Sequence, residues 1–186
     1  MKYLKKISFN APVTLSFTII CLIVVILGAL THNATTYSLF TIYRTSFLDP
    51  LLYVRLFTHV LGHIDFSHFA NNMTLFLLTA PLLEEKYGSK RLLFIILFVA
   101  FITGLINVIF TNNYLLGASG VVFAFIILSS ITGSDSGIPL TLIIVATIYL
   151  SNEIYTAIMV KDTISQLTHI IGGICGAFVG FYFKKC

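Results

Sequence analysis

Long stretches of this sequence carry no charged residue. No Asp, Glu, Lys or Arg occurs between residues 7 and 43, 67 and 83, or 92 and 134. Apolar residues make up 58% of the 186 positions and charged residues only 10%, a balance that is not typical of a water-soluble domain. Because a helix needs about 20 mostly apolar residues to cross a bilayer, these stretches predict a helical protein that has lipid as its solvent.

The uncharged stretches hold four predicted membrane-spanning helices and the mostly apolar residues that follow them hold two more, giving six helices in one all-α domain, residues 1–186. A cleaved signal peptide is the alternative for the first helix, since Lys2, Lys5 and Lys6 precede it. The apolar run is longer than the apolar core of a usual signal peptide and no A-x-A cleavage site follows, which favours a retained helix. The long connection at 32–65 mixes charged with aromatic residues and suits a segment at the membrane interface. The six helices are predicted at about 11–30, 66–83, 92–110, 115–132, 138–156 and 165–183.

The lysines and arginines favour one orientation of these helices. If the N-terminus lies in the cytoplasm, the outer side carries only Arg44, Arg55 and Lys161. The other eight basic residues then fall on the inner side, as the positive-inside rule requires, so both termini are predicted to be cytoplasmic. The net charge of +4 reflects this distribution. Because no polar segment combines basic with aromatic clusters, a nucleic-acid partner is not expected. The eight inner residues are Lys2, Lys5, Lys6, Lys86, Lys90, Arg91, Lys184 and Lys185.

Unusual polar residues occur in the first turns of the second, fourth and sixth predicted helices. In the predicted topology these three helices run inward from the outer face, so their first turns lie at one depth. His68 and Asn72 open the second helix, Ser119 opens the fourth, and His169 opens the sixth. Polar side chains at membrane depth normally face the bundle interior or a wet cavity. The pattern therefore predicts one shared site near the outer face.

The residue types of this predicted site suit acyl transfer. Ser119 lies in a Gly-Ala-Ser-Gly motif at 117–120, whose glycines leave the hydroxyl unobstructed. A serine hydroxyl needs a positioned base to become a nucleophile, and His169 is the only histidine in the second half of the chain. Ser119 and His169 are therefore the predicted nucleophile and base.

Donors for a developing oxyanion are also present. His68 and Asn72 stand one turn apart on one face of the second helix, and the backbone N–H of Ser119 is free near a helix start. The predicted helices offer no carboxylate at this depth, since Glu153 and Asp162 lie in an outer loop. A Ser–His dyad is therefore favoured over a triad.

Small residues on the sixth helix predict how it packs. Gly172, Gly176 and Gly180 recur every four residues, a pattern that lets a neighbouring helix approach closely. The matching face on the fourth helix is formed by Gly120 and Ala124. We expect this contact to set the distance between Ser119 and His169.

Taken together, these motifs resemble the rhomboid family of intramembrane serine proteases from residue 55 to residue 180. The resemblance implies ATP-independent cleavage of single-pass membrane proteins in or near their transmembrane segment, without cofactor, metal or nucleotide. It also implies that substrate enters between the second and fifth helices, beneath a cap formed by residues Asn152 to Ile164. The matching residues are Arg55-Leu56-Phe57-Thr58-His59, then His63, His68 and Asn72, the Gly-Ala-Ser-Gly motif, His169 with Gly172 and Gly176, and Glu84 with Gly88.

Three positions depart from the usual family pattern. Val54 precedes the arginine where an aromatic residue is common, and Thr168 precedes the histidine where a smaller residue is common. Phe123 follows the serine by four where a tyrosine is common, and its ring can still stack on His169. None of these three differences removes a predicted catalytic group, since Ser119 and His169 are both present. The residues expected to support the site are Arg55, Glu84, Gly117, Gly120, Phe123, Gly172 and Gly176.

Three alternatives compete with this interpretation. His59 and His63 have metal-ligand spacing, but a zinc protease would need a glutamate where Val60 stands, so structural hydrogen bonding is favoured. An inactive rhomboid-like protein that binds membrane clients would typically lack the serine or the histidine, and both are present. A small transporter would spread polar groups through the membrane depth, whereas here they gather near one face.

The expected location is the plasma membrane of a bacterium, because no transit peptide or added domain is recognised. The site would then lie near the extracytoplasmic face. The bilayer and transmembrane protein substrates are the expected partners.

Overall fold

The computed structural model describes residues 9–132, 138–160 and 163–184, which are helical and contain no β-strand. An isolated backbone bridge between Ile42 and Leu115 is present. Three short elements fill the segment between the first two long helices: α2 (Ala34–Leu39), α3 (Pro50–Thr58) and the 3₁₀ turn η2 (His59–Leu61). The long helices are α1 (Pro12–Leu30), α4 (Phe66–Tyr87), α5 (Ser89–Phe110), α6 (Ser119–Ile131), α7 (Leu140–Val160) and α8 (Thr163–Lys184).

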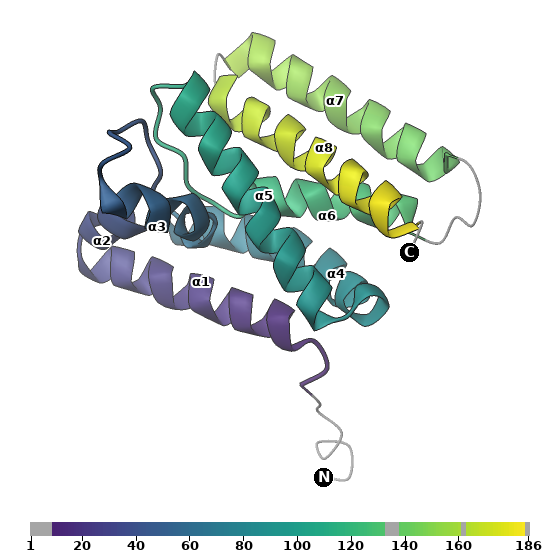
Figure 1. The fold of residues 1–186 in the computed structure, drawn as a ribbon, viewed down its shortest axis with the longest axis horizontal. Helices are drawn as coiled ribbons and strands as arrows, with labels where there is room; N and C mark the ends of the chain where they lie inside the picture. The colour runs from purple at the N-terminus through teal and green to yellow at the C-terminus, as the bar shows by residue number, and fades with distance from the viewer. Residues whose placement is uncertain (1–8, 133–137, 161–162, 185–186) are drawn as a thin grey trace.

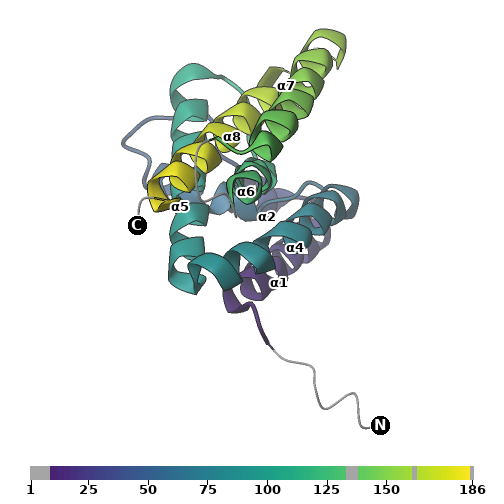
Figure 2. The same cartoon turned by 90° about the vertical axis from the view of Figure 1, so that its right-hand side faces the viewer.

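Helix α6 lies at the centre of the bundle. It contacts α4, α5, α7 and α8, and its most extensive contact is with α8. Figure 2 shows α6 nearly end on, with α1 and α4 below it and α7 and α8 above. The short connecting elements α2 and α3 lie together at one end of the bundle, on the left in Figure 1. Because α6 is apolar on all sides, as a fully buried helix is, its first residues are held inside the protein.

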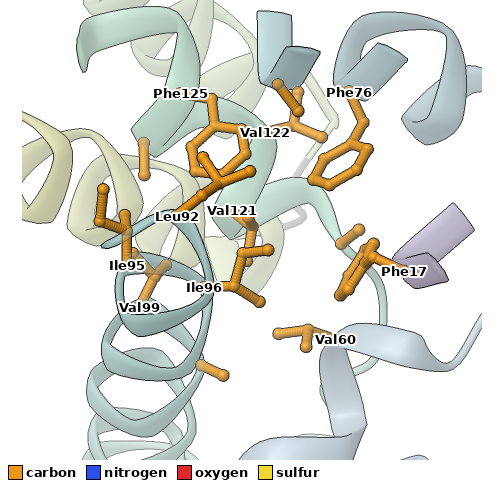
Figure 3. Close-up of a cluster of buried hydrophobic side chains, with 14 of the residues drawn as sticks. Phe17, Val60, Phe76, Leu92, Ile95, Ile96, Val99, Val121, Val122 and Phe125 are labelled. Atoms are coloured by element: carbon orange, nitrogen blue, oxygen red, sulfur yellow. The ribbon is translucent and has the colours of Figure 1, made fainter. Parts of the chain in front are cut away.

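A cluster of buried apolar side chains joins the helices around α6 (Figure 3). Phe125 of α6 stacks on Phe76 of α4 with ring centroids 5.5 Å apart, and Phe76 contacts Phe17 of α1 at 4.8 Å. Val121 of α6 belongs to the same cluster as Ile96 of α5. Close packing of this kind leaves little freedom for α6 to shift along its axis.

Glu84 joins the last turn of α4 to the first turn of α1. Its carboxylate accepts hydrogen bonds from the backbone N–H groups of Val13 and Thr14, both at 2.9 Å, and from the Thr14 hydroxyl at 2.7 Å. The Ser89 hydroxyl of α5 donates to it as well, at 2.7 Å. A carboxylate at a helix N-terminus is favoured because it satisfies N–H groups that have no partner within the helix. Glu84 thus ties three helices together.

Helix α6 begins at Ser119 and not near residue 115 as the sequence predicts. The backbone before it is irregular: Leu115 and Ile42 exchange two backbone hydrogen bonds, at 2.8 and 2.9 Å. Gly117 has φ +117° and donates its N–H to the His59 carbonyl at 2.9 Å. Hydropathy cannot reveal this boundary, because the segment is apolar, and irregular backbone is tolerated at membrane depth where the protein buries it.

The expected cap is also corrected. Helix α7 runs to Val160 and α8 begins at Thr163, so most of the range from Asn152 to Ile164 is helical and does not form a loop. The physical reason is that no proline or glycine interrupts residues 140–160. Charged residues mark helix ends poorly here, because α4 likewise continues through its charged residues to Tyr87.

Three helices of the described structure are long and apolar enough to cross a membrane: Pro12–Leu30, Ser89–Phe110 and the part of α8 from Gln166 to Phe183. Helix α6 has 13 residues, which is shorter than the roughly 20 that a spanning helix needs. Its neighbours surround it, so lipid contact does not dictate its length. Six spans with both termini cytoplasmic stay a prediction.

Candidate active site

Ser119 is the first residue of α6. The N–H groups of the first helical turn have no partner within the helix, and the residue before Ser119, Ala118, caps the helix without a side-chain hydrogen bond. Ser119 is half-buried. The structure therefore presents a hydroxyl and free backbone donors at one point in the interior of the bundle.

His68 and Asn72 of α4 lie directly against the segment that leads into Ser119. A Cβ atom built on Gly117 would stand 2.9 Å from Nε2 of His68 and 3.9 Å from Nδ2 of Asn72. Asp65 caps α4 by accepting the backbone N–H of His68 at 2.7 Å, which fixes where this helix begins. Asn72 is buried, and its Nδ2 also donates to the His68 carbonyl at 3.1 Å. The side-chain nitrogens of His68 and Asn72 thus reach the turn before Ser119. At position 117 only glycine fits beside them, because a Cβ atom would overlap the His68 ring.

His169 reaches the same place from α8. The ring of Phe123, one turn after Ser119 on α6, lies against the His169 ring with centroids 4.3 Å apart. A Cβ on Gly120 would stand 3.3 Å from Cγ2 of Thr168 and 3.7 Å from its carbonyl oxygen. Gly120, which follows Ser119, is therefore packed against Thr168, which precedes His169. His68 and His169 also lie close enough for their charges to interact.

Glycines let α6 and α8 approach until their backbones touch. A Cβ on Gly172 would stand 2.1 Å from the Gly120 carbonyl oxygen, and one on Gly176 would stand 2.2 Å from that of Ala124. These are the pairs that the small-residue pattern predicts. Because neither contact can be relieved by rotating a side chain, this spacing between the two helices depends on both glycines.

His59 and His63 make structural hydrogen bonds. Nδ1 of His59 pairs with the Arg55 carbonyl at 3.0 Å, and Nε2 lies 3.3 Å from the Thr103 hydroxyl. Nδ1 of His63 pairs with the Leu61 carbonyl at 3.2 Å, and its ring packs edge-on against His68 with centroids 5.1 Å apart. In the part of the chain that the structure describes, no group of three potential metal ligands forms.

Both imidazoles are held in the neutral form. Burial lowers the pKa of His59 to about 4. Burial also lowers the pKa of His63 to about 4, with a smaller contribution from the neighbouring His68. A neutral His63 adds no charge beside His68.

Two of the predicted support residues lie away from Ser119. Arg55 bonds to the Ser38 carbonyl and to Asp49 in the segment between α1 and α4. Glu84 stands four turns along α4 from His68, roughly 24 Å at 1.5 Å per residue. Their contacts hold the fold and do not touch the site, whereas Gly117, Gly120 and Phe123 line it.

Sequence reasoning missed Thr103 of α5. Its side chain contacts both the His59 ring and the position where a Cβ of Gly120 would lie. A hydroxyl in an otherwise apolar helix is the one available signal, and it is weak, because such groups usually bond to their own backbone, as Thr103 also does to the Val99 carbonyl at 2.7 Å.

Long apolar helices, packed on one another through buried apolar side chains, define this chain as a helical integral membrane protein. The chain belongs to the rhomboid family, since the family model for the Rhomboid domain matches residues 51–186, more than half of its length. That family consists in general of intramembrane serine proteases that act on membrane proteins within the bilayer. No match to the chain is found among curated proteins.

Proposed function

We propose that this chain is an intramembrane serine endopeptidase in which Ser119 is the nucleophile and His169 its general base. The observation that carries the proposal is the tight packing of α8 on α6, which brings Thr168 against Gly120 and the His169 ring against Phe123. The neighbour of each predicted catalytic residue thus touches the opposite helix. Membership in the rhomboid family supports the same assignment.

The proposed reaction proceeds through an acyl-enzyme. His169 accepts the proton of the Ser119 hydroxyl as its oxygen attacks the substrate carbonyl carbon, and the imidazolium then protonates the leaving amine as the peptide bond breaks. A water molecule, deprotonated by the same imidazole, attacks the ester, and Ser119 recovers its proton from His169 when the acid product leaves. A dyad suffices for these steps. Glu153 and Asp162, the acidic residues of the outer loop predicted from the sequence, have side chains outside the described part of the structure.

His68, Asn72 and the backbone N–H of Ser119 are the proposed donors to the oxyanion. Their proximity to Gly117 supports this role, because that residue lies two positions before the nucleophile. Preorganised donors stabilise charge that develops in the transition state, and each is worth roughly 3 kcal/mol.

The proposed substrates are single-pass membrane proteins, cut in or near their transmembrane segment without ATP. A substrate helix would enter sideways between α4 and α7. This route is supported by a cavity of about 380 Å³ over α6, lined by Thr79 of α4, Ser129 of α6 and Val145 of α7 among others. Because Ser129 lies ten residues along α6 from Ser119, about 15 Å at 1.5 Å per residue, this mostly apolar cavity would hold an apolar part of the substrate helix and not the bond that is cut.

The proposed orientation places both termini in the cytoplasm and the site near the extracytoplasmic face of a bacterial plasma membrane. The distribution of lysine and arginine supports it.

The test is cleavage of a single-pass model substrate in proteoliposomes without ATP. Wild-type protein should cleave it, whereas Ser119→Ala and His169→Ala should each abolish cleavage while thermal stability is kept. Ser67→Ala, at an exposed serine one residue before His68, is the matched control and should cleave normally. Cleavage by Ser119→Ala at the wild-type rate would contradict the proposal. A folded wild type that only binds the substrate would instead favour an inactive client-binding protein.

A further inference from the structure

A second cavity, with a partly polar lining, lies away from Ser119 and His169, between α2, α3 and the chain that leads to α6. Its volume is about 670 Å³, and its lining includes Tyr37, Tyr43, Tyr114 and Arg55. The tyrosine rings meet at steep angles: Tyr114 lies 6.4 Å from Tyr37 and 5.1 Å from Tyr43 between centroids. Such a volume is usual for a small-molecule site.

Arg55 forms one wall of this cavity and has donors to spare. Its Nε donates to the Ser38 carbonyl at 2.8 Å, its Nη1 contacts Asp49 at 3.3 Å, and its guanidinium lies 4.8 Å from the centre of the Tyr43 ring. A guanidinium carries five N–H donors, and the described part of the chain supplies no further acceptor for them. The side chain is only 6% exposed, so this cation is held rigidly.

The phenol hydroxyls add further donors. Within the described residues, none of the three hydroxyls makes a hydrogen bond to the protein. Tyr37 and Tyr114 are 48% and 64% exposed, so their rings stand at the mouth of the cavity. A held guanidinium flanked by free hydroxyls is suited to a tetrahedral anion with several acceptor oxygens, because arginine binds phosphate through two parallel hydrogen bonds.

The local charge is compatible with an anion. Asp49 offsets the charge of Arg55, but Arg44, next to Tyr43, supplies a second positive charge. Its guanidinium donates to the carbonyls of Val108 and Ile109 in the last turn of α5. Arg44 does not line the cavity, but it adds a second positive charge on the same stretch of chain, against the one carboxylate of Asp49.

The depth of the cavity indicates which phosphate it would meet. Tyr37 and Ser38 follow shortly after α1 ends at Leu30, and Tyr114 follows four residues after α5 ends at Phe110. Both helices are apolar enough to span a membrane, and tyrosine is enriched where such helices meet the headgroups. We infer that this cavity is a binding site for a phosphate group, at the level where a phospholipid presents one.

The test compares ligands that share or lack the phosphate. Full-length protein in detergent is titrated with dioleoyl phosphatidylglycerol, with dioleoylglycerol, and with glycerol 3-phosphate as competitor, and bound lipid is measured by native mass spectrometry. The triple variant Tyr37→Phe, Tyr43→Phe, Tyr114→Phe keeps every ring and removes three donors. The control is Tyr182→Phe, an exposed tyrosine in α8 outside the cavity.

We expect phosphatidylglycerol to bind wild type and Tyr182→Phe at least tenfold more tightly than the triple variant, and dioleoylglycerol to bind all three weakly. Competition by glycerol 3-phosphate would show that a soluble phosphate ester also fills the site. Failure to compete would assign it to membrane phospholipid. Equal binding of phosphatidylglycerol to wild type and triple variant, or dioleoylglycerol binding as tightly as phosphatidylglycerol, would overturn the inference.

Discussion

At Gly117 a single residue decides how closely α4 can approach the start of α6. Its φ of +117° is rarely adopted by other residues, and His68 occupies the space that a side chain would need. The sequence predicts this glycine as part of a serine motif but not the contact that requires it, because the contact comes from a helix some fifty positions earlier in the chain.

The proposed oxyanion donors can be tested one side chain at a time. We expect His68→Ala and Asn72→Ala each to lower kcat by about a hundredfold with little change in KM, since a donor that acts on the developing oxyanion stabilises the transition state alone. Asn71→Ala, at an exposed neighbour on the same helix, is the control and should leave kcat unchanged. A rise in KM without a fall in kcat would mean that these residues bind substrate and do not stabilise the oxyanion.

The candidate site residues follow from the sequence because polar groups are costly in lipid and are therefore conspicuous in it. Ser119, His169, His68 and Asn72 stand out for this reason. Thr103 and Arg44 do not, since their importance depends on partners that only the fold brings near: Thr103 on His59, and Arg44 on the end of α5.

Helices α6 and α8 form the element pair that sets the geometry of the site. We expect Gly172→Ala to destabilise the protein by about 1–3 kcal/mol and to reduce activity further, because the new methyl group would overlap the Gly120 carbonyl oxygen and push the helices apart. Thermal unfolding in detergent and the cleavage rate measure the two effects.

Gly180→Ala is the matched control for this prediction. The nearest atom to its new methyl group would be Cδ1 of Ile131, at 2.8 Å, which is the end of a flexible side chain. We expect a small loss of stability and near-normal activity. If Gly172→Ala behaved like Gly180→Ala, the spacing of the two helices would not control the site.

Apolar runs in the sequence predict which segments form helices better than they predict where each helix begins and ends. Charge marks the boundary of a run, yet α4 continues through Glu84 because that carboxylate is bound by donors of α1 and not by water. The start of α6 was missed for the opposite reason, since the segment before Ser119 is apolar but irregular. In both cases a contact between distant segments decides the boundary, and local sequence does not contain it.

At the scale of the whole molecule, Glu84 anchors α1 to the rest of the bundle. We expect Glu84→Gln to lower the free energy of unfolding by about 3 kcal/mol, because an amide offers one acceptor oxygen and places an NH₂ group against the N–H donors of Val13 and Thr14. Glu85→Gln, at the exposed neighbour, should have almost no effect on thermal unfolding. Equal stability of the two variants would show that the carboxylate does not secure α1.

The all-α architecture was predictable because lipid leaves the backbone few alternatives to the helix. The number of membrane spans was harder to predict. Length and hydropathy of the described residues identify three clear candidates, and α6 is short because it is enclosed by protein. Helix α6 lies at the centre of the bundle and contacts both α4 and α8, which lie on opposite sides of it in Figure 2. That arrangement is a property of the whole fold.

The most direct measurement is reaction of the folded protein with a fluorophosphonate probe in detergent, followed by mass spectrometry of the labelled peptide. Such a probe modifies only a serine that a neighbouring base activates. We predict a single adduct on Ser119, lost in His169→Ala although the serine is still present. A folded wild-type protein that stays unlabelled, or an adduct on another serine, would contradict the assignment of Ser119 and His169 as a catalytic pair.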